Sequence, residues 1–481
     1  MSAVTAEDLA FASVVQLADL LRTRKISPVE LVRVYLERIE RFDHRLRAYI
    51  TVLADRALEA ARRAEVELRS GEARGALHGI PYAVKDQFDV AGVLTTAGSR
   101  ILADHVASDT ATVVARLDQA GAIFLGKLNL TEFALGGTQE FPFGQPRNPW
   151  NTDHDPGGSS SGSGIAVAAG LCAFSLGEDT GGSVRSPASF CGVVGLRPTW
   201  GRVSRYGCFP LCPSMDTPGP LTRTVEDTAL ILGAIAGEDP RDPTTSRRPV
   251  PDYSRGLQGD IREVRIGLIR ELTFGSDTSV EVRDGVLAVA KELESHGATV
   301  EEVTLPILPR AGAIFMALAD SEGAGLHLGW LRTRPLDYDS GTRRRLLTAS
   351  LIPAAAYHQA ARARALLAKQ MHAALARHDV LLCPTAHQAA APIASGRAAI
   401  TSRADVAGRF FARRSYVTPA ALAGTPAIAM PCGFTSSGLP ISAQLIGRRF
   451  DEMTVLRAAH AYERATAWSR RPPLYNKGLA R

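Results

Sequence analysis

The sequence predicts an α/β protein built around one large mixed β-sheet. Short apolar segments such as residues 80–84 alternate with helical stretches such as residues 110–119, a pattern typical of strands joined by helical crossovers. Similar apolar segments recur near the C-terminus at residues 380–383, 427–431 and 441–446. These late segments resemble the early ones closely enough to complete one sheet, so we expect a single large domain.

Helices should flank these strands, beginning with a helical layer at the N-terminus. Ser27 can cap a helix that starts at Pro28, and Glu30 occupies the acidic position of a capping box. Apolar residues then recur at helical spacing along this segment, and a further helix ends near Ser70. Later helices are expected over residues 280–296, 311–332, 353–378 and 452–465.

The chain of 481 residues is longer than the usual domain of about 100–200 residues. The similarity of its early and late apolar segments nevertheless favours one domain spanning 1–481. We divide that domain into four parts by composition. They are an N-terminal helical layer (1–75), a core rich in glycine and serine (76–235), a more variable α/β region (236–400) and a C-terminal part of the core (401–481).

Composition and charge exclude several classes of protein. The net charge of +6, from 55 basic and 49 acidic residues, is spread along the chain, so a nucleic-acid partner is not expected. The six cysteines form no Cys-x-x-Cys pair and no zinc-binding spacing, so we expect no metal and no cofactor. The sequence starts without a signal peptide and has no membrane-spanning run, which indicates a cytoplasmic protein.

Two serine and glycine clusters and one lysine are the strongest functional signal. Residues 157–164 read GGSSSGSG, residues 179–183 read DTGGS, and Lys85 follows an apolar segment. A serine hydroxyl needs a neighbouring base to become a nucleophile, and a buried lysine can supply a neutral amine because burial lowers its pKa. The glycines before Ser183 also offer backbone amides that can converge on an oxyanion.

Simpler interpretations of the same residues remain open at this point. A glycine and serine run is often a linker, and a lysine at the end of a strand is often a surface residue. The run also contains a G-x-S-x-G pattern centred on Ser160, which in a nucleophile elbow must follow a strand directly. Here the preceding residues 151–156 have a turn composition, so we do not expect Ser160 to be the nucleophile.

Taken together, the motifs resemble the amidase signature hydrolases over nearly the whole chain. The matching segments are residues 148–151 (NPWN), 156–160 (PGGSS), 179–185 (DTGGSVR), 190–192 (FCG) and 195–199 (GLRPT). The resemblance implies a large mixed sheet covered by helices on both faces. It also implies an enzyme that cleaves carbon–nitrogen bonds other than peptide bonds through an acyl-enzyme.

The resemblance further implies a Ser-Ser-Lys triad. Ser183 would be the nucleophile, Ser159 the bridging serine held after a cis peptide bond, and Lys85 the base. The separation of 24 residues between the two serines matches the family. Backbone amides of the 180–183 loop, including those of Thr180, Gly181 and Gly182, would stabilise the oxyanion.

Three positions near the predicted triad invite further expectations. Most members of the family carry serine or threonine before the aspartate of the second cluster, whereas this chain has Glu178, so we expect different packing beneath that loop. By register with family pockets, Phe133 and Leu135 are candidates for the substrate-binding site.

Two functions compete for this family member. One is a standalone amidohydrolase acting on a small amide, carbamate or urea-like substrate, without a membrane or nucleic-acid partner and with room for a homodimer. The alternative is the glutamine-hydrolysing component of a tRNA-dependent amidotransferase, its A subunit. A protein that only binds its ligand is disfavoured because the triad is intact.

Arginines decide between these two functions at the level of sequence. In register with the amidotransferase component, Arg345 matches the arginine that binds the glutamine carboxylate, but Arg414 stands where an aspartate would receive the amino group. The C-terminal residues 461–472 also look more like a standalone amidase. We therefore expect the standalone hydrolase, and a pocket lined by Arg345 or Arg414 would favour an anionic substrate.

Overall fold

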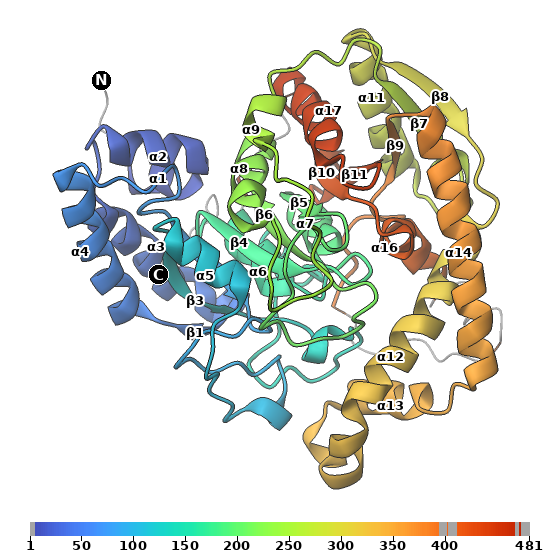
Figure 1. Ribbon diagram of the computed structural model, residues 1–481, viewed down its shortest axis with the longest axis horizontal. Coiled ribbons are helices and arrows are strands. Elements are labelled where there is room, and N and C mark those ends of the chain that lie inside the picture. The colour runs from blue at the N-terminus through green and yellow to red at the C-terminus, as the bar shows by residue number, and fades with distance from the viewer. Residues whose placement is uncertain (1–4, 394–401, 403–410, 467–470, 473–481) are drawn as a thin grey trace.

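A computed structural model describes residues 5–393, 402, 411–466 and 471–472. Eleven strands form one sheet in the order β1-β3-β2-β4-β6-β5-β10-β11-β9-β7-β8 (Figure 1). The predicted mixed sheet is therefore confirmed. The strands are β1 (Tyr49–Val52), β2 (Pro81–Lys85), β3 (Ile123–Leu128), β4 (Phe174–Glu178), β5 (Val194–Arg197), β6 (Pro218–Thr222), β7 (Arg265–Ile269), β8 (Thr299–Val303), β9 (Val380–Pro384), β10 (Ala427–Phe434) and β11 (Pro440–Gly447).

Parallel strands lie toward both ends of the sheet, and antiparallel strands fill its centre. Strand β2 runs parallel to β3 and β4, and β7 runs parallel to β8 and β9. Because parallel strands end at the same edge of a sheet, the pairing of Val84 with Leu176 brings Lys85 and Glu178 side by side. The loops that follow β2 and β4 therefore meet at one edge.

Helices cover both faces of this sheet and supply the crossovers between its parallel strands. Two groups of buried apolar residues pack between the helices and the sheet, and α12, α13 and α14 lie together beside one of them (Figure 1). The helices are α1 (Ala6–Phe11), α2 (Val14–Arg22), α3 (Pro28–Leu46), α4 (Ala54–Ser70), α5 (Thr112–Gln119), α6 (Ser161–Ala168), α7 (Arg185–Cys191), α8 (Val225–Ile235), α9 (Tyr253–Gly256), α10 (Arg270–Thr273), α11 (Val280–Ser295), α12 (Ala311–Thr333), α13 (Ser340–Ala349), α14 (Ala354–Arg377), α16 (Thr418–Ala423) and α17 (Glu452–Ala465).

The N-terminal layer forms as predicted, with one exception. The Ser27 side chain accepts from the Glu30 amide, and the Glu30 carboxylate accepts from the Ser27 amide, so the capping box of α3 is present. The expectation of helices alone in this layer is wrong, because β1 extends the sheet by pairing antiparallel with β3. The four residues of β1 are too few for a clear periodic signal, and tertiary pairing with β3 stabilises them.

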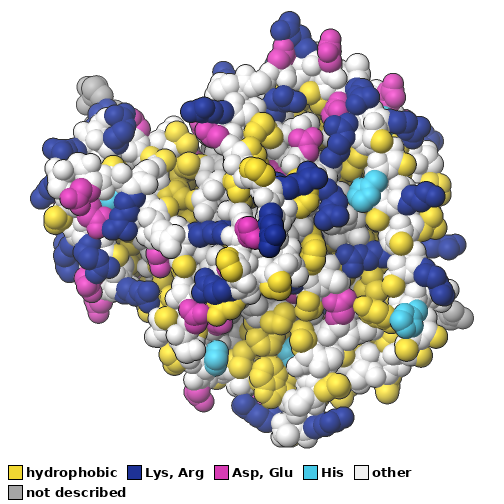
Figure 2. Space-filling view, in the orientation of Figure 1, with side chains coloured by type: hydrophobic (Ala, Val, Ile, Leu, Met, Phe, Trp, Pro, Cys, Tyr) yellow, Lys and Arg dark blue, Asp and Glu magenta, His cyan; other side chains and the backbone are white. Residues whose placement is uncertain are grey.

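Charged side chains are dispersed over the face of the molecule drawn in Figure 2. Figure 2 shows Lys and Arg side chains scattered across one face, with Asp and Glu side chains among them. Among the described residues, no helix is both long and apolar enough to cross a membrane. The chain therefore presents no membrane-spanning helix within the part that the structure describes.

Close backbone packing holds α6, which begins within the first serine cluster, against the end of β3. The Gly162 amide donates to the Asn129 carbonyl at 2.8 Å, and the Asn129 amide donates to the Ala48 carbonyl at 2.7 Å. A Cβ atom at Gly162 would lie 2.2 Å from the Ala48 carbonyl oxygen. Only glycine allows this approach, which fixes the start of α6 relative to the sheet.

Replacing Gly162 with alanine should destabilise the fold by about 2 kcal/mol or more, because rigid backbone atoms meet the added methyl group. Gly233 in α8 is a matched control, because it is an exposed helical glycine whose Cβ would meet nothing within 4 Å. Gly233→Ala should stabilise the protein by about 0.5–1 kcal/mol. Urea unfolding of both variants measures this contrast, and equal effects of the two would contradict the packing argument.

Candidate functional site

Lys85 lies at the end of β2, entirely buried, with its amine against the first serine cluster. Its Nζ atom lies 2.8 Å from Ser159 Oγ and 3.5 Å from the Glu178 carbonyl oxygen. Burial lowers the pKa of Lys85, and the nearby Glu178 carboxyl group opposes that shift. The geometry therefore places a buried amine within hydrogen-bond distance of a serine hydroxyl.

The two serine clusters contact each other directly. The Ser160 amide donates to the Ser183 carbonyl at 3.2 Å, so the loop after β4 lies against the start of α6. The Gly158–Ser159 peptide bond is cis, as the family resemblance implied. Ser183 is partly exposed, whereas Ser159 and Ser160 are buried. The structure thus brings together Lys85, Ser159 and the Ser183 loop, with Ser183 facing solvent.

A buried network of ion pairs and hydrogen bonds around Asp179 holds the Ser183 loop in place. The Asp179 carboxylate lies 3.1 Å from Arg185 Nη2 and 3.2 Å from Arg197 Nη1. Burial alone would raise the pKa of Asp179, but the two guanidinium groups hold it below its usual value. Asp179 also accepts from the Gly182 amide at 2.7 Å and from the Val184 amide at 3.2 Å. These bonds fix the loop in one conformation.

The same network reduces the number of backbone amides in this loop that are available to donate a hydrogen bond to an oxyanion. The Gly182 amide is already donated to Asp179. Within the described part of the chain, the amides of Thr180, Gly181 and Ser183 have no protein acceptor. Unpaired amides in one tight loop are the arrangement that an oxyanion hole requires.

Glycine is required at both positions before Ser183. Gly182 has a φ of +112°, and a Cβ atom there would lie 2.4 Å from Val417. At Gly181 a Cβ atom would lie 2.4 Å from the ring of Phe315 in α12. The loop after β4 is therefore pressed against two other elements, and α12 lies next to Gly181.

The two predicted pocket residues pack into an apolar cluster beside this loop. Phe133 and Leu135 are both buried. The Phe133 ring lies 4.5 Å from the His327 ring and 5.7 Å from the Tyr338 ring, centroid to centroid. His327 Nδ1 lies 2.9 Å from the Tyr338 hydroxyl. Burial lowers the pKa of His327 to about 4.

Arg345 is held in an ion pair that sequence reasoning did not find. Its Nη2 and Nε atoms donate to Asp320 Oδ1 at 2.5 and 3.0 Å, and both side chains are about one-tenth exposed. Asp320 belongs to α12, and Arg345 belongs to α13, so no sequence spacing relates them. Arg414 is partly buried, and its carbonyl accepts from the Thr418 hydroxyl at 2.8 Å.

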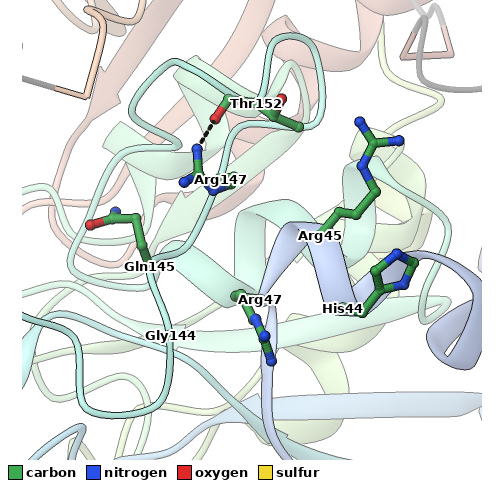
Figure 3. A pocket seen from close by; sticks show the side chains of 7 residues that line it. All are labelled: His44, Arg45, Arg47, Gly144, Gln145, Arg147 and Thr152. Carbon is green, nitrogen blue, oxygen red and sulfur yellow. Dashed lines mark hydrogen bonds between the residues drawn. The ribbon is translucent and has the colours of Figure 1, made fainter.

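A separate hollow of about 460 Å³ lies at the C-terminal end of α3 (Figure 3). Arg147 donates to the Thr152 carbonyl there at 2.9 Å. Neither serine cluster nor Lys85 contributes to this hollow, so it is distinct from the site above. Its lining residues are His44, Arg45, Arg47, Gly144, Gln145, Arg147 and Thr152.

Comparison with known proteins places this geometry in context. The family model described as Amidase matches residues 30–456. A relative from Moorella thermoacetica, named as the A subunit of glutamyl-tRNA(Gln) amidotransferase, is 40% identical over 97% of this chain and 99% of its own.

Solved structures agree with the sequence comparison. The structure of the same amidotransferase component from Thermotoga maritima has a TM-score of 0.79 and 33% identity, and the match covers 95% of each chain. Another structure is described as a vestigial complex that reveals the evolutionary origins of an s-triazine catabolic enzyme. It has a TM-score of 0.88 and 34% identity, and the match covers 96% of this chain and all of its own.

These relatives show that the expected standalone hydrolase is wrong. Several relatives that are about 40% identical over nearly the full chain bear the name of an amidotransferase component. The expectation rested on Arg414 and on residues 461–472, of which 467–470 lie outside the described residues. The charge of Arg414 affects a single contact, whereas the similarity to the amidotransferase components extends over nearly the whole chain. The overall similarity is therefore the stronger evidence.

The expected partners are wrong for the same reason. We expected a small-molecule substrate alone, no nucleic acid and at most a homodimer. The names of the relatives instead denote one component of an amidotransferase named for glutamyl-tRNA(Gln). The dispersed charge of this chain gave no sign of a tRNA-dependent enzyme, because one component of such an enzyme can lack a basic patch of its own.

His327 should make stability depend on pH. Because its pKa is lowered by burial to about 4, the folded state resists protonation, and stability is full above the unfolded value of about 6.5. Stability should fall by about 2–3 kcal/mol as pH drops from about 6.5 to about 4. Urea unfolding across this range should show a flatter dependence in His327→Leu than in the wild type.

The exposed His358 supplies the control for this measurement. His358→Leu should leave the pH dependence as steep as in the wild type. If the stability of His327→Leu depends on pH as steeply as that of the wild type, His327 is not the source of the pH dependence.

Proposed function

Because the chain belongs to the amidase family, we propose that it is the glutamine-hydrolysing component, the A subunit, of a tRNA-dependent amidotransferase. It is an amidohydrolase that acts on carbon–nitrogen bonds other than peptide bonds. In the proposed complex it releases ammonia from glutamine, and a partner protein uses the ammonia on glutamyl-tRNA(Gln). The 40% identity over nearly the full length of the amidotransferase relatives supports this assignment.

The contact between Lys85 and Ser159 carries the proposed mechanism. Neutral Lys85 accepts the Ser159 proton, and Ser159 accepts the proton of Ser183, whose oxygen attacks the glutamine amide carbon. A bond forms between Ser183 and the acyl carbon. The proton then returns through the relay to the leaving ammonia, and water releases glutamate from the acyl-enzyme.

The loop after β4 stabilises the charge that develops on the carbonyl oxygen. Amides of Thr180, Gly181 and Ser183 are available as donors, while Gly182 supplies the required backbone conformation. One lost donor in such a site costs about 3–4 kcal/mol of transition-state stabilisation. Asp179 and its two arginines act by holding this loop in place.

The pair of Asp320 and Arg345 suits the zwitterionic end of glutamine. Arg345 can bind the α-carboxylate, and Asp320 can bind the α-ammonium group that Arg414 would repel. Phe315 of α12 lies against Gly181, and Asp320 follows about five residues later, a rise of about 7.5 Å along the helix. Phe133 and Leu135 belong to the apolar cluster beside this region.

We also propose that the whole chain is one domain, because every strand of the described chain hydrogen-bonds into one sheet. The four parts inferred from composition then correspond to segments of a single unit. A cytoplasmic location follows from the proposed partners, since aminoacyl-tRNA is used in that compartment.

Replacing Ser183 with alanine should lower glutamine hydrolysis by about a thousandfold or more, because no acyl-enzyme can form. Lys85→Ala and Ser159→Ala should cause losses of similar size, because the three residues act as a unit. Ammonia release from glutamine, measured with the partner proteins present, tests this.

Ser160→Ala is the matched control in the same cluster, and its activity should stay within about tenfold of the wild type. A Ser183→Ala enzyme as active as the wild type would overturn the proposed nucleophile. Loss of all activity in Ser160→Ala alone would instead favour the G-x-S-x-G interpretation.

Replacing Arg345 with glutamine should raise KM for glutamine about 10- to 100-fold, because a charged hydrogen bond to the carboxylate is lost. The kcat value should change little if the interaction is made equally in substrate and transition state. Hydrolysis of propionamide, which lacks the carboxylate, should be unaffected. The exposed neighbour Arg344 provides the control Arg344→Gln, and equal KM values for the two variants would contradict the assignment.

A further inference from the structure

Glu178 is a buried acid beside Lys85 that the proposed mechanism does not use. It is the last residue of β4, and its side chain is 0% exposed. Its Oε2 atom lies 3.6 Å from Lys85 Nζ. The parallel pairing of β2 and β4 places the backbones of these two residues at the same edge of the sheet.

The two carboxyl oxygens of Glu178 have different surroundings. Oε1 lies 2.9 Å from the Thr180 hydroxyl and accepts from the Thr217 amide at 3.4 Å. Oε2 is buried and has no hydrogen-bond partner in the described structure. An unpaired buried oxygen is costly, and the charged group in contact with it is the Lys85 amine.

The other carboxyl groups around this pair have additional hydrogen-bond or ion-pair partners. Asp179 is neutralised by Arg185 and Arg197. Asp216 accepts from the Leu211 amide at 2.9 Å and from the Cys212 amide at 2.9 and 3.0 Å. Its Oδ1 atom also lies 2.8 Å from the Thr180 hydroxyl, whose single proton can be donated to only one of Asp216 and Glu178.

Cys208 also faces the pair electrostatically, and burial raises the pKa of its thiol. Neither Asp216 nor Cys208 forms an ion pair with Lys85 in the described structure. Glu178 is therefore the carboxyl group in ion-pair contact with the Lys85 amine.

We propose that Glu178 is a positioning residue that controls the charge of Lys85, its carboxylate keeping a proton on the amine until the pH rises. This inference rests on the proposed role of Lys85 as the base. As the pH rises, the pair releases one proton to solvent, passing from a Lys85 ammonium beside a Glu178 carboxylate to a neutral Lys85 amine beside the same carboxylate. Only the neutral amine can accept the proton of Ser159.

The titration of Glu178 is consistent with this pairing. Burial and the nearby Asp216 together raise the pKa of Glu178 to about 7, although the Lys85 amine opposes both effects. Because the two groups are in ion-pair contact, they titrate as a pair. A buried carboxylate next to the ammonium favours the charged lysine, so removing it should let Lys85 lose its proton at lower pH.

The test measures how the reactivity of Ser183 depends on pH in wild type and Glu178→Gln. Phenylmethylsulfonyl fluoride forms a bond from its sulfur to the serine oxygen as fluoride leaves and the base takes the serine proton. Its inactivation rate therefore reports the neutral base without requiring glutamine as the substrate. In Glu178→Gln the midpoint of the rise with pH should move about one to three pH units lower.

The control is Glu132→Gln, which neutralises another buried glutamate. Glu132 accepts from the Ser99 hydroxyl at 2.6 Å and forms no ion pair with Lys85 in the described structure. Burial also raises the pKa of Glu132. The midpoint in Glu132→Gln should therefore equal that of the wild type.

An unchanged or higher midpoint in Glu178→Gln would overturn the proposal, even if the rate falls, because a purely structural role changes the rate and not the midpoint. Glu178→Ser provides a second neutral variant in case the glutamine variant does not fold, and it should shift the midpoint in the same direction. Circular dichroism checks that each variant is folded.

The two proposals can fail separately. A chain that reacts with the reagent at Ser183 but releases no ammonia from glutamine contradicts the amidotransferase function and leaves this test intact. A wild-type chain that does neither overturns both.

Discussion

Burial of Lys85 is the constraint on which the rest of the site depends. An amine at the end of β2 that is closed off from water loses the solvation that normally keeps it charged. The parallel strands β3 and β4 enclose it on both sides, and the chain entering α6 brings Ser159 within 2.8 Å of its nitrogen. Without that enclosure the lysine would be an ordinary ammonium, and the proposed relay would have no base.

A second constraint is the shape of the loop that presents Ser183. The Asp179 carboxylate forms ion pairs with two buried arginines and accepts hydrogen bonds from the amides of Gly182 and Val184. Buried charges of this kind are stable only when paired and fully hydrogen-bonded. Within the described residues, the same network leaves three neighbouring amides without a protein acceptor, so rigidity and the proposed oxyanion site have a common origin.

Similarity to amidotransferase components and the position of Asp320 together change the interpretation of the arginines. Considered alone, Arg345 and Arg414 indicate an anionic substrate, and Arg414 argues against glutamine. The ion pair between Arg345 and Asp320 provides both charges that an α-amino acid requires. The proposed glutamine site therefore does not need an aspartate at position 414.

The sequence by itself predicted most of the elements and the mixed sheet, because periodicity and capping are local properties. Its resemblance to the amidase signature hydrolases singled out Lys85, Ser159 and Ser183 as the candidate triad. It also indicated that Glu178 is unusual. Only the tertiary structure decided what these residues contact: the Lys85 to Glu178 approach across β2 and β4, the Gly182 amide bound to Asp179, and the partner of Arg345. Such contacts join segments that sequence periodicity does not relate, and sequence spacing carries no information about them.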